Sequence, residues 1–316
     1  MISKNVLGIT FFILTLALFM TTRSQGQSHK GVMKFWYSDE GSVYLNMHVR
    51  YNSRIDSGKI LFDNNAYVPL LNEKDNQHFS NEGAAKQLLN LTLPMHSPFG
   101  ISKRRLVVGR FEFFCNEICF KTDGVATMER AAFTSIFGQE YLGVAGNDFL
   151  KQNIVLFDFK DTVIRFLDKN ELHEIISTEG LKEYPCKVES SKHPNSPLSI
   201  YLREDSLSHI QYLLDFGYNG GICMNESFLT SMASQPKDLN VKKAPFSSVT
   251  GITDTMEARV CNNYELKIGK EKHTLKLVVL DEKQFKSDPI LGMDFIRLHS
   301  YLAIDAIEKK VYYRLQ

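Results

Sequence analysis

The sequence predicts an all-β protein made of two homologous β-barrel lobes, and three observations favour that class. Short alternating or wholly apolar runs recur between turn residues about every 8–12 residues, as in barrels and sandwiches. Helical patterns are few. The second half of the chain repeats a pattern of the first. The 316 residues, 43% of them hydrophobic, are enough for two domains of ordinary size.

The expected strands form two series. The first comprises residues 42–49, 59–62, 106–114, 154–159 and 162–166, and the second comprises 198–202, 209–214, 264–269, 275–280, 301–305 and 310–313. These runs are rich in the β-branched and aromatic residues that favour strands. Helices are expected mainly at 81–89 and 170–182. The polar segment from 170 to 196, with Pro185 and Pro194, predicts a boundary between an N-terminal lobe at 27–183 and a C-terminal lobe at 184–316.

Residues 1–26 have the pattern of a signal peptide. Lys4 provides a positive charge, residues 6–20 form an apolar run of 15 residues, and Ser24-Gln25-Gly26 offers a cleavage site. The run is short for a membrane span, which needs about 20 apolar residues. We therefore expect a secreted or periplasmic protein without stable membrane insertion after signal cleavage, the alternative being an uncleaved anchor.

The charge balance bears on nucleic acid as a partner, and the cysteines bear on disulfides and metal sites. The 37 basic and 36 acidic residues are interspersed, so nucleic acid is not an expected partner. Cys115 and Cys119 flank the tip of an expected hairpin, where a disulfide would join the two strands; buried free thiols are the alternative. Their C-x-x-x-C spacing lacks a second pair and nearby histidines, so no metal site is expected.

The repeat is carried by two glycine segments and two aspartates. The string Gly-Asn-Asp-Phe-Leu at 146–150 matches Gly-Met-Asp-Phe-Ile at 292–296, with an offset of 146 residues (292 − 146). Asp215 ends an apolar strand 77 residues before the second string (292 − 215), and Asp63 ends one 83 residues before the first (146 − 63). Duplication of one lobe would set these two carboxylates opposite each other across a pseudo-twofold axis.

At these residues the chain resembles the pepsin-like and retropepsin-like aspartic peptidases, in particular the exported two-lobed bacterial members. The resemblance rests on the apolar-apolar-Asp-x-Gly string at 213–217, the apolar-apolar-Asp string at 61–63 and the Gly-x-Asp-Phe string of each half. It extends from about residue 43 to residue 313. It implies two acid-protease-like barrel lobes with a central cleft, and an endopeptidase that hydrolyses peptide bonds.

The resemblance implies that Asp63 and Asp215 are the catalytic pair, sharing one proton and one water. Two carboxylates about 3 Å apart cannot both ionise readily, so one stays protonated while the other acts as a base. Gly217 and Tyr218 follow Asp215 and are expected to border the substrate, a polypeptide. The resemblance implies neither a metal nor another cofactor. Asp148 and Asp294 are expected to anchor loops or cap a helical turn in each half.

Three positions depart from the Asp-Thr-Gly or Asp-Ser-Gly motif of the family. Asn64 and Phe216 stand where each family loop has a hydroxyl that hydrogen-bonds across to the other lobe; Asn64 can still donate a hydrogen bond, and Phe216 cannot. Asn65 replaces the glycine of the first motif and brings a side chain beside the carboxylates. These departures define the alternative function, a catalytically decayed protein of the same fold that binds an extended peptide or a protein partner.

Overall fold

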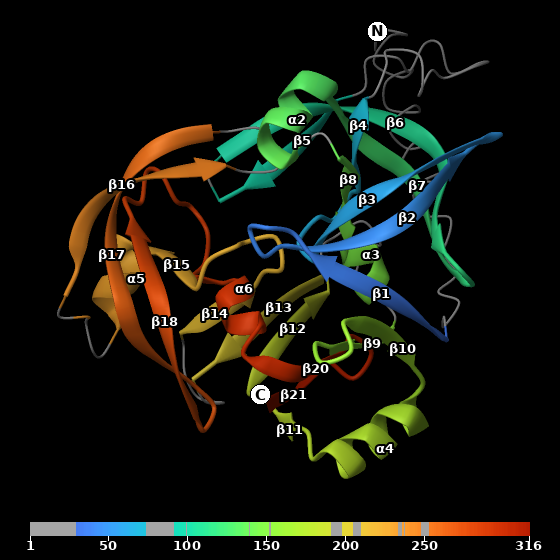
Figure 1. Ribbon diagram of the computed structural model, residues 1–316. Coiled ribbons are helices and arrows are strands. Elements are labelled where there is room, and N and C mark those ends of the chain that lie inside the picture. Colours follow the sequence, from blue (N-terminus) through green and yellow to red (C-terminus); the bar gives the residue numbers. More distant parts are fainter. Residues whose placement is uncertain are drawn as a thin grey trace, which may run out of the picture.

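The fold is described from a computed structural model that places residues 30–73, 92–98, 100–138, 140–151, 153–190, 198–204, 210–232, 236, 238–247 and 253–316. The signal peptide expected at 1–26 and the helix expected at 81–89 lie outside these described residues. Within them, none of the helices is long and apolar enough to cross a bilayer. Most of the regular structure is β-strand, arranged in two sheets (Figure 1).

The first sheet contains thirteen strands. In chain order they are β1 (Gly31–Tyr37), β2 (Val43–Tyr51), β3 (Arg54–Asp63), β4 (Leu70–Glu73), β5 (Thr92–Ser97), β6 (Gly100–Cys115), β7 (Ile118–Glu129), β8 (Tyr141–Gly146), β9 (Ile154–Asp158), β10 (Val163–Leu167), β11 (Lys182–Glu183), β20 (His299–Asp305) and β21 (Lys310–Leu315). Six of them, β2, β3, β8, β4, β7 and β6, form a closed ring because β2 pairs with both β3 and β6.

The second sheet contains eight strands. They are β12 (Cys186–Ser190), β13 (Leu198–Arg203), β14 (Gln211–Leu214), β15 (Ile222–Asn225), β16 (Asn240–Ser247), β17 (Thr253–Ile268), β18 (Glu271–Leu280) and β19 (Ile290–Leu291). Among the described residues this sheet does not close, because its order runs from β12 at one edge to β16 at the other. The structure is therefore mostly β, with one closed barrel and a second, open sheet, where the sequence predicted two barrels.

The pairing of two corresponding strands explains why only one barrel closes. In the first sheet, β1 pairs with residues 43–45 of β2 and leaves the far end of that strand free, so residues 48–51 pair with β6. In the second sheet, β12 pairs with residues 198–202 of β13, which covers five of its six residues. No comparable free edge of β13 is left to receive β17.

The two sheets nevertheless repeat one strand order. The order β2-β3-β8-β4-β7-β6-β5 in the first corresponds to β13-β14-β19-β15-β18-β17-β16 in the second. The parallel pairs also correspond, since β3 with β8 matches β14 with β19, and β4 with β7 matches β15 with β18. A short helix follows β8 and β19 alike. Duplication of one unit produces such a correspondence.

Alternating sequence explains the barrel strands. In β2, the residues Val43, Leu45, Met47, Val49 and Tyr51 are buried, and the residues between them face outward. Strand β9 is different, because all five of its residues are buried and its sequence is apolar until the final aspartate. This strand lies inside the first sheet, with β10 on one side and β20 on the other.

Five helices complete the described structure: α2 (Arg130–Phe137), α3 (Asn147–Leu150), α4 (Lys169–Glu179), α5 (Glu226–Ser231) and α6 (Met293–Ile296). Helix α4 corresponds to the helix predicted at 170–182 and begins with a capping box in which Asp168 and Glu171 satisfy each other's backbone N–H groups. Helices α2 and α5 were not predicted. Helix α2 has no side-chain cap, and its one buried residue is Phe133.

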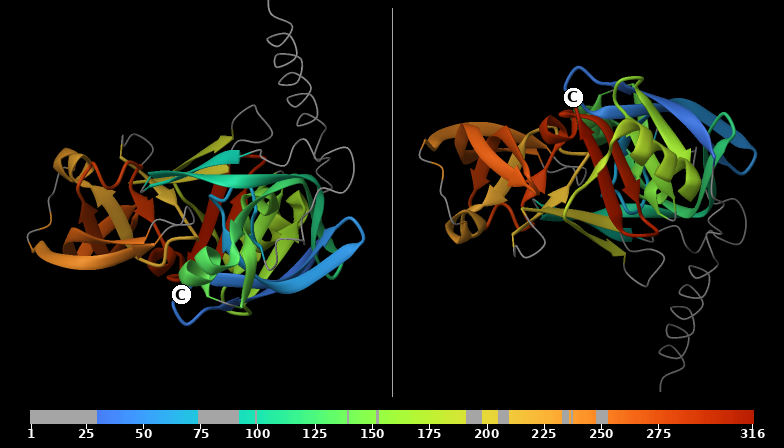
Figure 2. Two further views of the ribbon diagram at one scale, coloured as in Figure 1. Left: turned by 90° about the horizontal axis from the view of Figure 1, so that it is seen from above. Right: turned by 90° about the horizontal axis from the view of Figure 1, so that it is seen from below.

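The C-terminal strands return to the first sheet. Strand β20 pairs antiparallel with β9, and β21 pairs with β20 and β11. In Figure 2 these red strands lie between the orange strands of the second sheet and the green strands of the first. Strand β11 of the first sheet ends at Glu183, and β12 of the second sheet begins at Cys186. The last two strands nevertheless bind the halves together.

The hairpin that holds Cys115 and Cys119 forms as predicted, from β6 and β7. Its register pairs Cys115 with Ile118 and Phe114 with Cys119. Neighbouring residues of a strand point to opposite faces, so the two thiols lie on opposite sides of the hairpin. Both cysteines are free, as are Cys186, Cys223 and Cys261. The expected disulfide between the strands is therefore wrong, and the alternative of free thiols holds.

Candidate functional site

The structure brings Asp63 and Asp215 together. Asp63 is the last residue of β3 and Asp215 directly follows β14, the two corresponding strands of the repeat. A Cβ atom built on Gly217 would lie 2.8 Å from Asp63 Cγ and 3.1 Å from Asp215 Oδ1. The two carboxyl groups therefore border the same point. Gly217 is exposed and Asp215 is half-buried, so this point is open to solvent.

The two aspartate loops have matching backbone hydrogen bonds. The Asn65 N–H donates to Asp63 Oδ1 over 2.8 Å, and the Gly217 N–H donates to Asp215 Oδ1 over 2.8 Å. Each bond joins an aspartate to the residue two positions later, as in an Asx turn. Each side chain is thereby held in place by its own loop, in the same manner in both halves.

The environment of the pair favours one shared proton. Burial, followed by the charge of Asp215, raises the pKa of Asp63 from 3.8 to about 7. Burial also raises the pKa of Asp215, against hydrogen bonds from the Gly217 N–H and the Asn65 side chain. Two neighbouring carboxyl groups with raised pKa values titrate as a unit. The raised pKa values therefore favour a state in which one of the two carboxyl groups keeps its proton.

Asn64 links the two loops with a single side chain. Its amide nitrogen donates to the Leu214 carbonyl over 2.8 Å, and its amide oxygen accepts a hydrogen bond from the Phe216 N–H over 2.8 Å. Asn64 is fully buried, so neither backbone group could turn to water instead. The sequence indicated only that Asn64 can donate. In the structure it both donates and accepts, on either side of Asp215.

Phe216 reaches the first half through packing. Its ring is fully buried and lies against Phe62 at 5.1 Å between centroids and against Phe157 at 4.6 Å. Phe62 precedes Asp63 in β3, so the residue after one aspartate packs on the residue before the other. Phe216 thus connects the halves by an aromatic contact.

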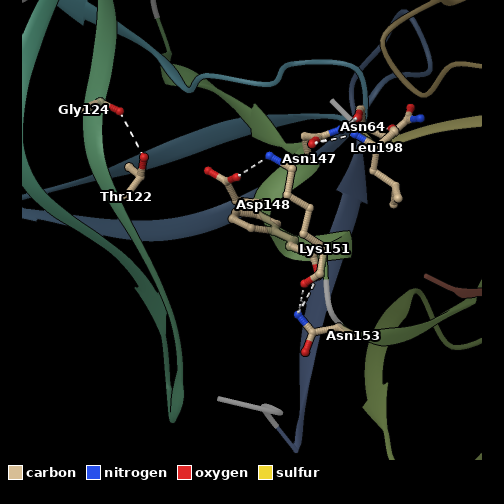
Figure 3. A network of polar contacts seen from close by, with 9 residues as sticks. Asn64, Thr122, Gly124, Asn147, Asp148, Lys151, Asn153 and Leu198 are labelled. Atoms are coloured by element: carbon tan, nitrogen blue, oxygen red, sulfur yellow. Dashed lines mark hydrogen bonds and ion pairs between the residues drawn. The ribbon is translucent and has the colours of Figure 1, made fainter. Parts of the chain in front are cut away.

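Asn147 is a site residue that the sequence analysis missed. Its side chain donates to the carbonyls of Asn64 and Leu198 and accepts from the Leu198 N–H over 3.1 Å. Figure 3 shows the Asn147 amide between these two backbone segments. Its place directly after Gly146, in a string that otherwise repeats, was the available signal, because the matching residue is apolar Met293. Asn147 therefore holds the first aspartate loop against β13.

The repeated glycines touch the aspartate loops. A Cβ atom on Gly146 would lie 2.4 Å from the Asp63 carbonyl oxygen, and one on Gly292 would lie 2.3 Å from the Tyr218 carbonyl oxygen. Such distances leave no room for a side chain. The two residues are required because the chain passes so close to the loops.

The aspartates of the repeated strings lie in the first turns of the short helices that follow those glycines. Asp148 in α3 pairs with Lys151 at 3.3 Å, and Asp294 in α6 pairs with Arg297 at 3.1 Å. Each ion pair spans three positions of its own chain segment. The expected anchoring role agrees with these contacts.

Tyr218, predicted to border the substrate, is half-buried and directed toward the second half. Its ring packs on a cluster that includes Cys223, Phe285 and Ile290. Burial raises its pKa well above 10.0, so the phenol is neutral at ordinary pH. Of the two residues predicted to bind substrate, Gly217 lies directly between the carboxyl groups. Tyr218 supports the loop from the side that faces the core of the second half.

A polar pocket of about 580 Å³ lies elsewhere in the second half and contains neither aspartate. It is lined by Asn225, Ser227, Phe228, Glu282, Phe285, Lys286, Ser287 and Asp288. In the part of the chain that the structure describes, no group of three or more histidine, cysteine, aspartate or glutamate side chains is placed to hold a metal ion.

Comparison with known proteins bears on the fold alone. No family model matches the chain, and no curated protein matches it. Among solved structures, basic 7S globulin from soybean is similar over 89% of this chain and 93% of its own, with 12% identity and a TM-score of 0.50. Conglutin gamma, a basic 7S globulin from lupine seeds, is 12% identical over 90% of this chain and 94% of its own, with a TM-score of 0.49. The chain therefore shares the fold of the soybean protein.

Proposed function

We propose that the protein is an aspartic-type endopeptidase, which hydrolyses peptide bonds with a water activated by Asp63 and Asp215. The observation that carries this proposal is the meeting of the two carboxyl groups around Gly217, at a point open to solvent. Their backbone bonds match, and their raised pKa values favour one shared proton. Neutral and ionised carboxyl groups side by side can act as acid and base in one step.

The chemistry follows from that shared proton. The ionised carboxylate takes a proton from water while the water oxygen forms a bond to the scissile carbonyl carbon. The protonated carboxyl group gives its proton to the carbonyl oxygen, so a neutral tetrahedral diol results. Collapse of the diol breaks the C–N bond: the proton taken from water passes to the leaving amine, and one diol hydroxyl gives its proton to the ionised carboxylate as the C=O bond forms again. The pair returns to its starting state with one proton.

We infer that the barrel and the second sheet are the two lobes of an acid-protease-like fold, with a polypeptide lying extended between them. The repeated strand order supports this inference, because it places one aspartate at the same point of each copy. The signal-peptide pattern at 1–26 supports action outside the cytoplasm, in the periplasm or after secretion.

The test compares cleavage by the natural protein with cleavage by Asp63→Asn and Asp215→Asn. An unfolded, fluorescence-quenched protein serves as substrate from pH 4 to pH 8. Each substitution should lower the rate at least about 100-fold, because a general acid or base is lost. Asp148→Asn, which removes a carboxylate from the Lys151 pair, is the matched control and should keep the natural rate. Absence of cleavage by the folded natural protein across this range would reject the proposal.

A second candidate is a binding protein with an inactive pair. The observation that favours it is Asn65, which places a side chain beside the second aspartate loop, where it donates to the Leu214 carbonyl, at a position where the family has a glycine. In this case an extended peptide would be retained without being cut. Its test is equilibrium binding of an unfolded peptide followed by mass analysis: intact peptide, bound equally well by Asp63→Asn, is the expected result. Peptide fragments that disappear with that substitution would exclude this candidate.

A further inference from the structure

We propose that Ser42 is a positioning residue of the aspartate pair: from the first half, its hydroxyl holds Asn219 of the second aspartate loop and so keeps Asp215 facing Asp63. Ser42 Oγ donates to Asn219 Oδ1 over 2.6 Å, across 177 positions of the chain. The catalytic consequence rests on the proposed function, whereas the placement of the two carboxyl groups can be measured without turnover.

The turn that carries Ser42 is closed by its own hydrogen bonds. It lies between β1 and β2. The Ser38 N–H donates to the Ser42 carbonyl over 2.8 Å, and the Gly41 N–H donates to the Ser38 carbonyl over 2.9 Å. The Ser42 N–H donates to Ser38 Oγ over 3.0 Å. An ordered backbone thus presents the hydroxyl, so little conformational freedom is lost when it binds Asn219.

The same turn lies against α6 of the second half. Gly41 is buried and has a φ of 90°, a conformation that favours glycine. A Cβ atom there would lie 2.7 Å from a guanidinium nitrogen of Arg297, which ends α6 and pairs with Asp294 at 3.1 Å. Figure 1 shows the blue turn reaching toward α6. The turn therefore meets the second half at the helix that supports the second aspartate loop.

Asn219 lies where that loop is already fixed on both sides. The carbonyls of Tyr218 and Gly220 accept hydrogen bonds from the backbone N–H groups of the first two residues of α6, over 2.8 Å and 3.1 Å. These bonds attach the loop to its own half. The bond from Ser42 attaches it to the opposite half, which carries the other aspartate.

Asp215 is thereby placed between two attachments to the first half. On one side, Asn64 binds the Leu214 carbonyl and the Phe216 N–H. On the other side, Ser42 binds Asn219. With the first attachment alone the loop can pivot about Asn64. With both, its direction relative to the first half is set.

The first aspartate loop is braced in a corresponding way. Strands β2 and β13 correspond in the repeat, and Ser42 directly precedes β2 as Leu198 begins β13. Asn147 binds the carbonyl and the N–H of Leu198 and also the Asn64 carbonyl of the first loop. In both halves, therefore, the start of this strand holds the aspartate loop of the opposite half through an asparagine side chain.

Loss of the Ser42 hydroxyl should weaken the interaction between the two carboxyl groups. The interaction energy of two charges falls as their separation grows and as water enters between them. The substitution Ser42→Ala removes no charge, and the charged groups beside the turn, Arg297 and Asp294, stay paired with each other. A change in how the aspartates titrate would therefore report their placement.

The direct test follows the two carboxyl groups by ¹³C NMR in purified protein with labelled aspartate, using Asp63→Asn and Asp215→Asn to assign the signals. The natural protein should show two separate apparent pKa values, as interacting carboxyl groups do. In Ser42→Ala the gap between these values should narrow by about 0.5 pH units or more, because the loop is freer to move. Titration curves that coincide in the two proteins would overturn the proposal.

Three further variants keep the test decisive. Ser42→Thr retains the hydroxyl and should retain the natural gap, and narrowing equal to that of Ser42→Ala would contradict the proposal. Asn219→Ala breaks the same bond from the other side, so the double variant with Ser42→Ala should narrow the gap no more than either single variant. Additive narrowing would show that the two residues act separately. If Ser42→Ala is poorly folded by circular dichroism, the Asn219→Ala curves decide.

Activity separates this inference from the proposed function. If the protein cleaves peptide, Ser42→Ala should lower kcat between about 10-fold and 100-fold with KM nearly unchanged, because the pair is displaced and no contact to substrate is lost. Ser57→Ala is the matched control, at an exposed serine whose hydroxyl lies 2.6 Å from His48 Nδ1, and should leave both rate and gap unchanged. A narrowed gap in a protein that never cleaves supports the inference and rejects the function. Cleavage with kcat and gap unchanged in Ser42→Ala supports the function and rejects the inference.

Discussion

At the scale of single residues, the site depends on asparagine side chains that each satisfy several backbone groups. Asn64 holds the second aspartate loop, and Asn147 holds the first loop against β13. An amide both donates and accepts, so one asparagine makes the two bonds that a rotating hydroxyl also makes. The aromatic contact of Phe216 then supplies the rest of the connection between the halves.

Asn64→Ala should therefore be among the costly substitutions of this protein. It leaves the Leu214 carbonyl without the short bond and the Phe216 N–H without its acceptor, both in a buried region. We expect the free energy of unfolding to fall by about 2–4 kcal/mol, measured by urea denaturation. The exposed Asn170→Ala should change it by less than about 0.5 kcal/mol. Equal effects of the two would show that Asn64 does not carry the link.

At the scale of elements, the parallel pairs β3 with β8 and β14 with β19 bring each aspartate to a glycine of the repeat. Asp63 is the register partner of Gly146, and the pairing of Leu214 with Leu291 brings Asp215 beside Gly292. Helix α6 then continues from Gly292, and its Met293 N–H donates to the Tyr218 carbonyl over 2.8 Å. The end of β19 and the first turn of α6 thus support the second aspartate loop.

Gly292→Ala tests this support. The added Cβ would lie 2.3 Å from the Tyr218 carbonyl and 2.5 Å from the Gly220 carbonyl, and both are backbone atoms that cannot turn aside. We expect a loss of about 3 kcal/mol or more in the free energy of unfolding, together with loss of any cleavage activity. Gly180→Ala, which meets no atom within 4 Å but has a φ of 64°, should cost only about 1 kcal/mol. Urea denaturation compares the two, and an equal cost would show that space at Gly292 is not limiting.

At the scale of the whole molecule, the strand series and the meeting of the aspartates could be predicted because alternation and repetition are visible in sequence. Closure of only one sheet into a barrel could not be predicted, because it depends on how many residues of β2 pair with β1 and how many residues of β13 pair with β12. The free thiols of Cys115 and Cys119 depend on the register of the hairpin, which spacing does not determine. Helix α2 lacks a cap and has one buried residue, so its pattern is weak. The site residues Asn64 and Asn147 are positioned by contacts across the two sheets.

A buried histidine lies where the two sheets meet. His299 in β20 is fully buried, accepts a hydrogen bond from Tyr184 at 2.8 Å and donates to the Ile296 carbonyl at 2.9 Å. Both bonds suit the neutral ring. Around it lie Phe295 of α6 and Tyr313 of β21, and His273 of β18 contributes to its electrostatic environment. Burial lowers the pKa of His299 from 6.5 to about 4.

Stability should therefore respond to pH in two opposing ways. The unfolded chain binds a proton at His299 more readily than the folded one, so this residue's contribution is complete above pH 6.5 and is lost as the pH falls to about 4. That loss is about 3 kcal/mol. Asp63 has the opposite effect: its folded pKa of about 7 exceeds 3.8, so its contribution is present below pH 3.8 and is lost as the pH rises toward 7.

Single substitutions separate the two effects, and urea denaturation at intervals from pH 4 to pH 7.5 measures them. Asp63→Asn removes the titration of Asp63 and leaves that of Asp215, so the free energy of unfolding should fall more steeply on acidification from pH 6.5 to pH 4 than it does in the natural protein. His299→Gln keeps a hydrogen-bonding side chain but does not titrate, so the stability of that variant should rise as the pH falls from 7 toward 4. The double variant should show the weakest dependence over this range. A fall on acidification that is equally steep in Asp63→Asn and in the double variant would show that His299 is not the acid-sensitive group, and would direct attention to His273, whose pKa burial also lowers.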